Sequence, residues 1–321
     1  MMRKKIRHSK RPQVVSVDQW GEESEKLLSE FLALTCSLFQ RENATELPIW
    51  ISNRLYLSLQ RTTESAVILA SHGRIWDIEI LFRSILEGTT KLAFILSDSE
   101  KAEERAHEFW YTLAEINGIR RYQRSKGYEE KDDFCDIGCP IEDELLSDFP
   151  DKELLKSLQK KYPYLERARI EKNWTFLYLI ETLNQQDDPP TRALSTILGA
   201  YITSSNFSHQ DSISLGLIRE RSSRPPKERE QLNNAHIAGR LSDLLDLSFY
   251  RSWLLFRING LDHDPLWQLY ESKKEFFASL EEAQKIGEKV EKNEPLDPPI
   301  KVTPKKPRRY YRPSSKKIKK E

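Results

Sequence analysis

The stretch that decides the fold of this chain is residues 66–96, AVILASHGRIWDIEILFRSILEGTTKLAFIL, the longest apolar-rich run in the sequence. At about 100° per residue on a helix, Glu79, Arg83 and Glu87 fall four residues apart on one narrow stripe. The neighbouring sector holds the apolar side chains of Ile75, Ile78, Leu81, Phe82, Ile85 and Leu86, and such a sector indicates packing against a core. The Glu–Arg–Glu row is therefore either a structural chain of ion pairs or one wall of a site.

Two helices are expected to form a hairpin in this region. Pro48 suits the first turn of a helix that ends near Ser71, and Gly73 suits the turn that follows. One unbroken helix from Pro48 to Leu96 would be unusually long for a globular domain. We therefore predict helices over about 49–71 and 74–97, with His72 in the turn.

Composition points to an all-α fold. The chain has 321 residues, 38% of them hydrophobic and 31% charged, which suits a soluble helical protein with a buried core. Only 11 glycines are present, fewer than a sheet-rich fold with many tight turns would need. The apolar runs are too short to cross a membrane, and no apolar stretch follows the basic N-terminus. We expect a cytoplasmic helical bundle with no membrane contact.

The predicted organisation is a basic N-terminal arm (1–20), a helical domain (21–290) with an irregular acidic insertion at about 126–165, and a disordered basic tail (291–321). Within the domain, apolar periodicity predicts further helices at 22–41, 100–125, 174–183, 191–207, 228–258 and 265–289. The insertion contains only a short helical piece near 152–161, and a loop is expected from the end of the 191–207 helix to about Lys227.

The net charge of +1 hides a division along the chain. Residues 1–12 carry six Lys/Arg and no acid, and residues 299–321 carry ten Lys/Arg and one Glu. The tails therefore sum to 6 + 10 − 1 = +15, which leaves the body at 1 − 15 = −14. Such tails can bind nucleic acid, dock on acidic partners, fold back on the acidic body or remain solvated.

A second polar stripe lies in residues 191–209, TRALSTILGAYITSSNFSH. Tyr201, Ser205 and His209 are spaced four apart and share a sector with apolar residues. Polar groups on such a face need partners, because burying one unpaired costs about 1–3 kcal/mol. The candidate partners are the Glu79–Arg83–Glu87 row and a bound ligand. We predict that Arg83, Glu87, Tyr201, Ser205 and His209 converge on one polar cluster.

The pattern of Gly73, then Arg83-Ser84-x-x-Glu87, with a later Tyr-x-x-x-Ser-x-x-x-His helix, resembles an uncharacterised all-helical family of bacteria, a domain of unknown function. The likeness covers roughly residues 45–250, and it implies a fold and a site position but no activity. The architecture is also distantly similar to the HEPN group, many members of which are RNases of defence and toxin systems. Their Arg-x4–6-His motif is missing upstream of His209, while Arg257…His263 and Arg3…His8 fit its spacing.

Three functional classes follow. The first is a module that binds a small anionic ligand through Glu79, Arg83, Glu87, Tyr201, Ser205 and His209. The second is a HEPN-like ribonuclease or other hydrolase, with His209 as general base and Arg83 and Glu87 as further catalytic candidates. The third is a structural interaction protein, one component of a phage-defence or toxin–antitoxin set, for which a homo-oligomer is one candidate assembly.

The structural alternatives are a packing ion pair for Arg83–Glu87 and a histidine at the edge of the core for His209. No P-loop, nucleophile elbow, Gly-rich dinucleotide turn or HExxH is present, so we expect no cofactor. Cys135 and Cys139 supply only two ligands where structural zinc needs four, so no metal is expected either.

Overall fold

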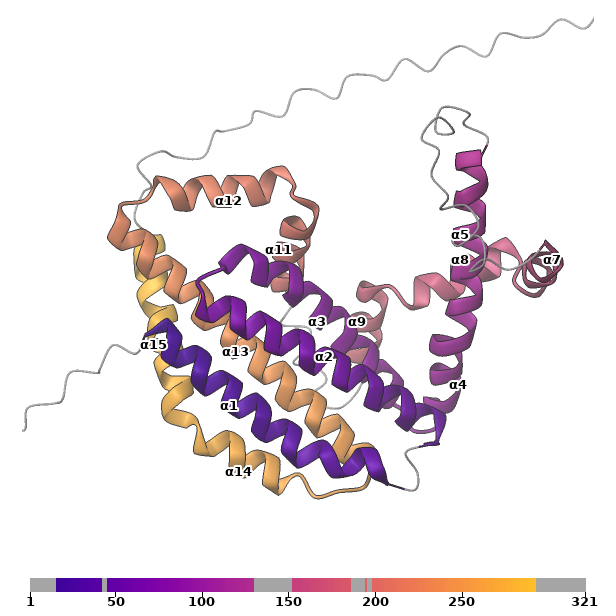
Figure 1. Ribbon diagram of the computed structural model, residues 1–321, viewed down its shortest axis with the longest axis horizontal. Coiled ribbons are helices and arrows are strands. Elements are labelled where there is room, and N and C mark those ends of the chain that lie inside the picture. The colour runs from indigo at the N-terminus through magenta and orange to yellow at the C-terminus, as the bar shows by residue number, and fades with distance from the viewer. Residues whose placement is uncertain (1–15, 42–44, 130–151, 186–193, 195–197, 293–321) are drawn as a thin grey trace, which may run out of the picture.

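The computed structural model describes residues 16–41, 45–129, 152–185, 194 and 198–292 (Figure 1). Helices make up the regular structure of these ranges, which contain no strand, so the prediction of an all-α bundle is confirmed. The helices, in chain order, are α1 (Val17–Cys36), η1 (Ser37–Gln40), α2 (Leu47–Ser71), α3 (Ile75–Leu96), α4 (Ala102–His107), η3 (Glu108–Thr112), α5 (Leu113–Glu129), α7 (Lys152–Lys161), α8 (Tyr164–Asn173), α9 (Phe176–Asn184), α11 (Leu198–His209), α12 (Ser212–Ser223), α13 (Pro226–Ile258), α14 (Asp264–Ser272) and α15 (Lys274–Glu291).

The centre of the molecule is a bundle in which α1, α2 and α3 pack around the long helix α13, with α15 along its outer side (Figure 1). The expected hairpin is present, because α2 ends at Ser71, α3 begins at Ile75, and Gly73 takes the left-handed φ of +70° that a tight turn needs. The apolar side chains on the inner face of α3 are buried, as their helical spacing predicted. Ile78, Phe82 and Ile85 have 0% exposure. His72 lies in the turn as the C-cap of α2.

Helix α1 begins earlier than the sequence pattern indicated. Ser16 and Gln19 form a reciprocal capping box, in which each side chain accepts from the other residue's backbone N–H. Trp20 is buried, and its indole Nε1 donates to Ser279 Oγ on α15 at 3.0 Å. Residues 17–20, which were placed in the basic arm, are part of this helix.

The middle of the chain forms an arm of α5, α7 and α8 that projects from the bundle (Figure 1). Glu115 of α5 holds α7 by accepting from Lys161 Nζ at 2.8 Å and Tyr162 Oη at 2.5 Å, and Arg120 holds α8 by donating to Glu171 at 2.5 Å. The expected helical piece at 152–161 is α7. α8 lies where no helix was predicted, while residues 130–151, with Cys135 and Cys139, lie outside the described part.

Two predictions for the C-terminal half are wrong. The expected loop before Lys227 is the helix α12, which is capped by Asp211 through its carboxylate contacts with two backbone N–H groups. The helix expected over 265–289 is interrupted, because α14 ends at Ser272 and α15 begins at Lys274. Residues 293–321, where the disordered basic tail was predicted, and the basic arm at 1–15 lie outside the described residues.

One arginine is buried at the centre of the bundle. Arg251 of α13 has 0% exposure, and its guanidinium donates to Thr89 Oγ1 at 3.1 Å and Thr63 Oγ1 at 3.0 Å. None of the carboxylates in the described ranges forms an ion pair with it, and its Nε has no partner there. Burial accordingly lowers the pKa of Arg251 to about 10. Keeping this guanidinium charged in the core therefore costs desolvation free energy.

Candidate functional site

The candidate site lies where α3, α11 and α13 meet. α11 runs antiparallel to α3, since Trp76 stacks on Phe207 near one end and Glu87 bonds Tyr201 near the other. This direction brings the two polar stripes of the sequence against each other. The stripes form two clusters: a buried one around Glu79 and a partly exposed one around Arg83.

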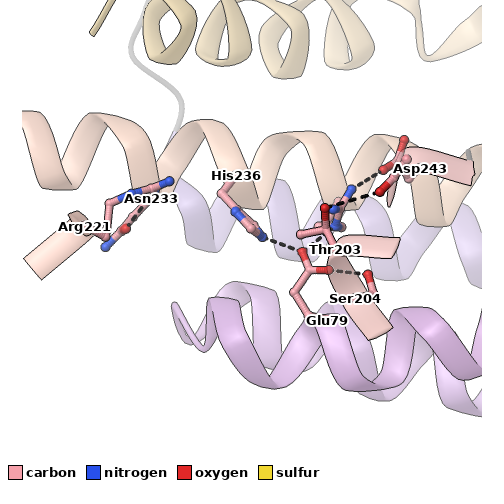
Figure 2. A network of polar contacts seen from close by, with 9 residues as sticks. Glu79, Thr203, Ser204, Arg221, Asn233, His236 and Asp243 are labelled. Carbon is pink, nitrogen blue, oxygen red and sulfur yellow. Dashed lines mark hydrogen bonds and ion pairs between the residues drawn. The ribbon is translucent and has the colours of Figure 1, made fainter. Parts of the chain in front are cut away.

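The buried cluster is centred on Glu79, whose side chain has 0% exposure (Figure 2). Ser204 of α11 donates to one carboxylate oxygen, and His236 Nε2 and Arg240 Nε of α13 donate to the other, both at 2.6 Å. Arg240 also donates to Asp243 Oδ2 at 2.7 Å. Both oxygens of Glu79 are therefore occupied by side chains of two other helices.

Burial alone would raise the pKa of Glu79, but the hydrogen bond from His236 and the charge of Arg240 outweigh it and lower the pKa to about 2. The carboxylate is thus ionised at neutral pH and fully paired. A group with no exposed surface cannot reach an external ligand without moving. The carboxylate of Glu79 therefore joins three helices, and the ligand-binding role expected of it stays a prediction.

The second cluster lies at the surface, next to the first. Arg83 Nε donates to Glu87 Oε1 at 3.0 Å, and the same oxygen accepts from Tyr201 Oη at 2.9 Å. The two charged side chains are 23% and 33% exposed. Tyr201 stacks on Phe176 of α9 with ring centroids 3.8 Å apart, which fixes the hydroxyl toward Glu87. Burial and the neighbouring Glu87 raise the pKa of Tyr201, so the hydroxyl keeps its proton and acts as a donor.

His209, the last residue of α11, completes this cluster. Arg83 Nη1 lies 2.8 Å from His209 Nε2. Because a guanidinium only donates, Nε2 is the acceptor in this contact. We predicted that the two groups would lie within about one ligand's reach with a water-sized gap or pocket between them, and the structure places them in direct contact instead. His209 itself is exposed.

The comparisons with known proteins bear on these helices. A model of a family of unknown function, DUF5677, matches residues 50–224. The chain belongs to this DUF5677 family. The expected resemblance to an uncharacterised all-helical family is thereby confirmed. Searches among curated proteins and among solved structures gave no match.

The DUF5677 match contains the Arg83 cluster completely, since Arg83, Glu87, Tyr201 and His209 all lie within it. It contains only half of the buried cluster, because His236 and Arg240 follow its end. Those two partners of Glu79 were missed in the sequence. Their spacing of four on a long helix is a detectable signal, but nothing local indicates that their stripe faces Glu79.

Ser205 was expected in the cluster, and the structure places its neighbour there instead. Ser204 is fully buried and bonds Glu79, whereas Ser205 is only partly buried and makes no side-chain hydrogen bond with another described residue. Neighbouring residues on a helix point about 100° apart, so an error of that size in the expected rotation of α11 exchanges these two serines.

The pair Arg257 and His263, which fits the HEPN-type spacing, lies elsewhere in the molecule. Arg257 donates to the Leu96 backbone oxygen at 3.0 Å, and both Arg257 and His263 lie against the ring of Trp253. Arg257 is 17 residues beyond Arg240 on α13, about 26 Å along the helix, so this pair is remote from the Arg83 cluster. Arg3 and His8 lie outside the described residues. No comparison supports a HEPN likeness.

Two grooves occur elsewhere on the surface. One of about 400 Å³ is lined by Tyr270, Lys274 and Glu281 among others, and one of about 350 Å³ lies beside Gly73 and Asn233. Neither is lined by the Arg83 cluster. Within the described ranges, His, Cys, Asp and Glu side chains form no group of three or more that could hold a metal ion, and no helix is long and apolar enough to cross a membrane.

Proposed function

We propose that this DUF5677 protein is an interaction module that docks another protein surface on the Arg83 cluster and the apolar residues around it. The residues of this surface, here called the docking face, come from α3, α11 and α12. They are Ile80, Arg83, Glu87, Ile202, His209, Ile213 and Leu217.

The observation that carries the proposal is the concentration of exposed apolar side chains around the polar cluster. Ile80, one turn before Arg83 on α3, is 43% exposed, and Ile202, two turns before His209 on α11, is 55% exposed. Ile213 follows His209 by four residues across the turn and is 58% exposed. Large apolar side chains left this exposed on three adjoining helices favour an interaction site.

Helix α12 strengthens this interpretation. Of its twelve residues only Ser214 is buried, although Ile213, Leu215 and Leu217 are large apolar residues. A helix that buried none of its apolar side chains would gain little from folding, because most helical stability in proteins comes from such burial. A partner on this face would bury them.

Arg83 and His209 give the face the polar centre that protein interfaces use. Arginine is enriched at interface hot spots, and its planar guanidinium can exchange an internal partner for a carboxylate of a docked protein. A carboxylate of a docked protein could replace His209 Nε2 as the acceptor for Arg83 Nη1, because that contact lies at the surface.

Hydrolysis by His209 has less support. A general base needs a free lone pair facing its substrate, and here the acceptor nitrogen of His209 already accepts from Arg83. Neither groove adjoins this ring. A role in bacterial defence and a HEPN-like ribonuclease activity remain predictions from sequence resemblance alone.

A photoreactive residue tests the docking face. Incorporated at Ile213 of the full chain in cells that make the protein, it should give a crosslinked adduct of defined mass after irradiation. Ile202→Asp in the same chain should abolish that adduct. The matched control is the photoreactive residue at Ile286 on α15, which is 37% exposed and far from the face in sequence. Equal yields at the two positions would refute the proposal.

A further inference from the structure

We infer that the docking face binds the same face of a second copy of this chain, so that two protomers pair about a two-fold axis. The inference rests on the proposed docking function and names its partner. It is carried by the arrangement of charge on α3 and by the distribution of apolar side chains on α11 and α12.

The exposed charges on α3 are complementary to themselves. Arg83 and Glu87 are one turn apart and partly exposed, with opposite charge. When two such helices cross antiparallel with the axis midway between the residues, Arg83 of each protomer meets Glu87 of the other. A two-fold interface requires this property, because each contact between two residues is repeated with the roles exchanged. An unrelated partner would need to supply the matching pair.

Arg83 and Glu87 can each form a further hydrogen bond to a partner copy. Glu87 Oε1 accepts both from Arg83 Nε and from Tyr201 Oη, so both of these hydrogen bonds use the same carboxylate oxygen. Oε2 is the acceptor left for the guanidinium of the partner copy. Arg83 has donors beyond those used for Glu87 and His209, since a guanidinium carries five N–H groups. The pairs across the axis can therefore form while the pairs within each protomer persist.

Apolar side chains flank the charged pair. Ile202 and His209 are seven residues apart on α11, and Ile213 and Leu217 are four apart on α12, so each pair shares a helix face. Packing against the same residues of the second copy would bury them without leaving an unpaired charge. Ile202, Ile213 and Leu217 are 55%, 58% and 39% exposed, so pairing with a second copy has apolar area to bury.

Sedimentation velocity of the full chain over a wide concentration range tests the inference. The wild-type chain should sediment as a dimer that dissociates on dilution. Ile213→Asp should weaken the dimer by about tenfold or more, because each dimer carries the buried charge twice. Ile286→Asp is the matched control at an exposed isoleucine outside the face and should leave the dissociation constant unchanged.

Charge exchange gives a second, sharper measurement. Arg83→Glu places carboxylates at both positions 83 and 87, and Glu87→Arg places guanidinium groups at both. Like charges would then meet across the two-fold axis, so each variant alone should be monomeric. An equimolar mixture of the two should restore a dimer containing one chain of each kind. Circular dichroism of both variants checks that the helices persist, and Ile213→Asp keeps the test valid if either charge variant fails to fold.

The outcomes separate this inference from the docking function. A chain that stays monomeric, or a dimer that neither Ile213→Asp nor charge exchange affects, overturns the second copy as partner. If photocrosslinking at Ile213 then yields an adduct with a different protein, the docking function stands without it. A monomer that gives no adduct overturns both.

Discussion

Replacing Glu79 by glutamine tests whether one buried carboxylate holds α3, α11 and α13 together. The substitution keeps the size of the side chain and removes the charge that His236 and Arg240 both face at 2.6 Å. Arg240 then keeps only Asp243 as a carboxylate partner. Removing one member of a buried ion pair is strongly destabilising, because the remaining charge stays out of water.

The magnitude follows from the pKa of Glu79. Its ordinary value is 4.5 and its value in the folded protein is about 2, a difference that corresponds to roughly 3 kcal/mol of folding stability at neutral pH. Because the folded-state pKa is the lower one, this stability is fully present above 4.5 and is lost as the pH falls toward 2. The difference between wild type and Glu79→Gln should be roughly 3 kcal/mol at about pH 5–7 and about half of that near pH 3.

Equilibrium urea unfolding followed by circular dichroism at several pH values measures this difference. The matched control is Glu281→Gln on α15, which removes an ion pair with Lys285 whose side chains are 64% and 52% exposed. An exposed pair of that kind should cost less than about 1 kcal/mol, so the control should unfold nearly as wild type does. The reasoning fails if Glu79→Gln costs as little as the control, or if its cost stays constant from about pH 5 to pH 3.

Three further predictions concern packing, the buried cation and the tails. Gly287→Ala should destabilise the protein by about 1–3 kcal/mol, because the new Cβ would lie 2.3 Å from Ala235 Cβ. Gly216→Ala, which has open space around the new Cβ, should stabilise the protein by up to about 1 kcal/mol. Thermal unfolding compares the two variants. Arg251→Met should raise the free energy of unfolding by about 1 kcal/mol or more, because it removes a buried cation that has hydroxyl partners rather than a carboxylate. Urea unfolding measures this, and a lowered midpoint would show that the guanidinium is needed. Deleting residues 293–321 should abolish most binding of RNA or DNA, and the binding of the full chain should fall steeply with salt in a titration followed by fluorescence anisotropy; equal binding by the truncated chain would exclude the tail.

Much of the architecture was predictable because helix periodicity is a local property. The apolar rows of residues 66–96 gave the α2–α3 hairpin, and Gly73 gave its turn. Local patterns failed where apolar periodicity is weak. α12 carries Ile213, Leu215 and Leu217 without a buried apolar row, so it resembled a loop, although Asp211 at its start is an N-cap signal.

The candidate site was predictable in part for the same reason. Steps of four along a single helix placed Arg83 beside Glu87, and Tyr201 on the same sector as His209. The choice between Ser204 and Ser205 depended on how α11 is rotated against α3, which no spacing within α11 specifies. The structure placed Ser204 against Glu79.

The sequence by itself determined which residues share a helix face, because the period of about 3.6 residues fixes that relation along the backbone. Only the tertiary structure decided which faces meet. Glu79 finds His236 and Arg240 on a helix 157 and 161 residues away, and their approach depends on the packing of α13 against α3. Those long-range contacts divide the Glu79–Arg83–Glu87 row, so that its first residue is a buried ion-pair centre and its other two remain at the surface.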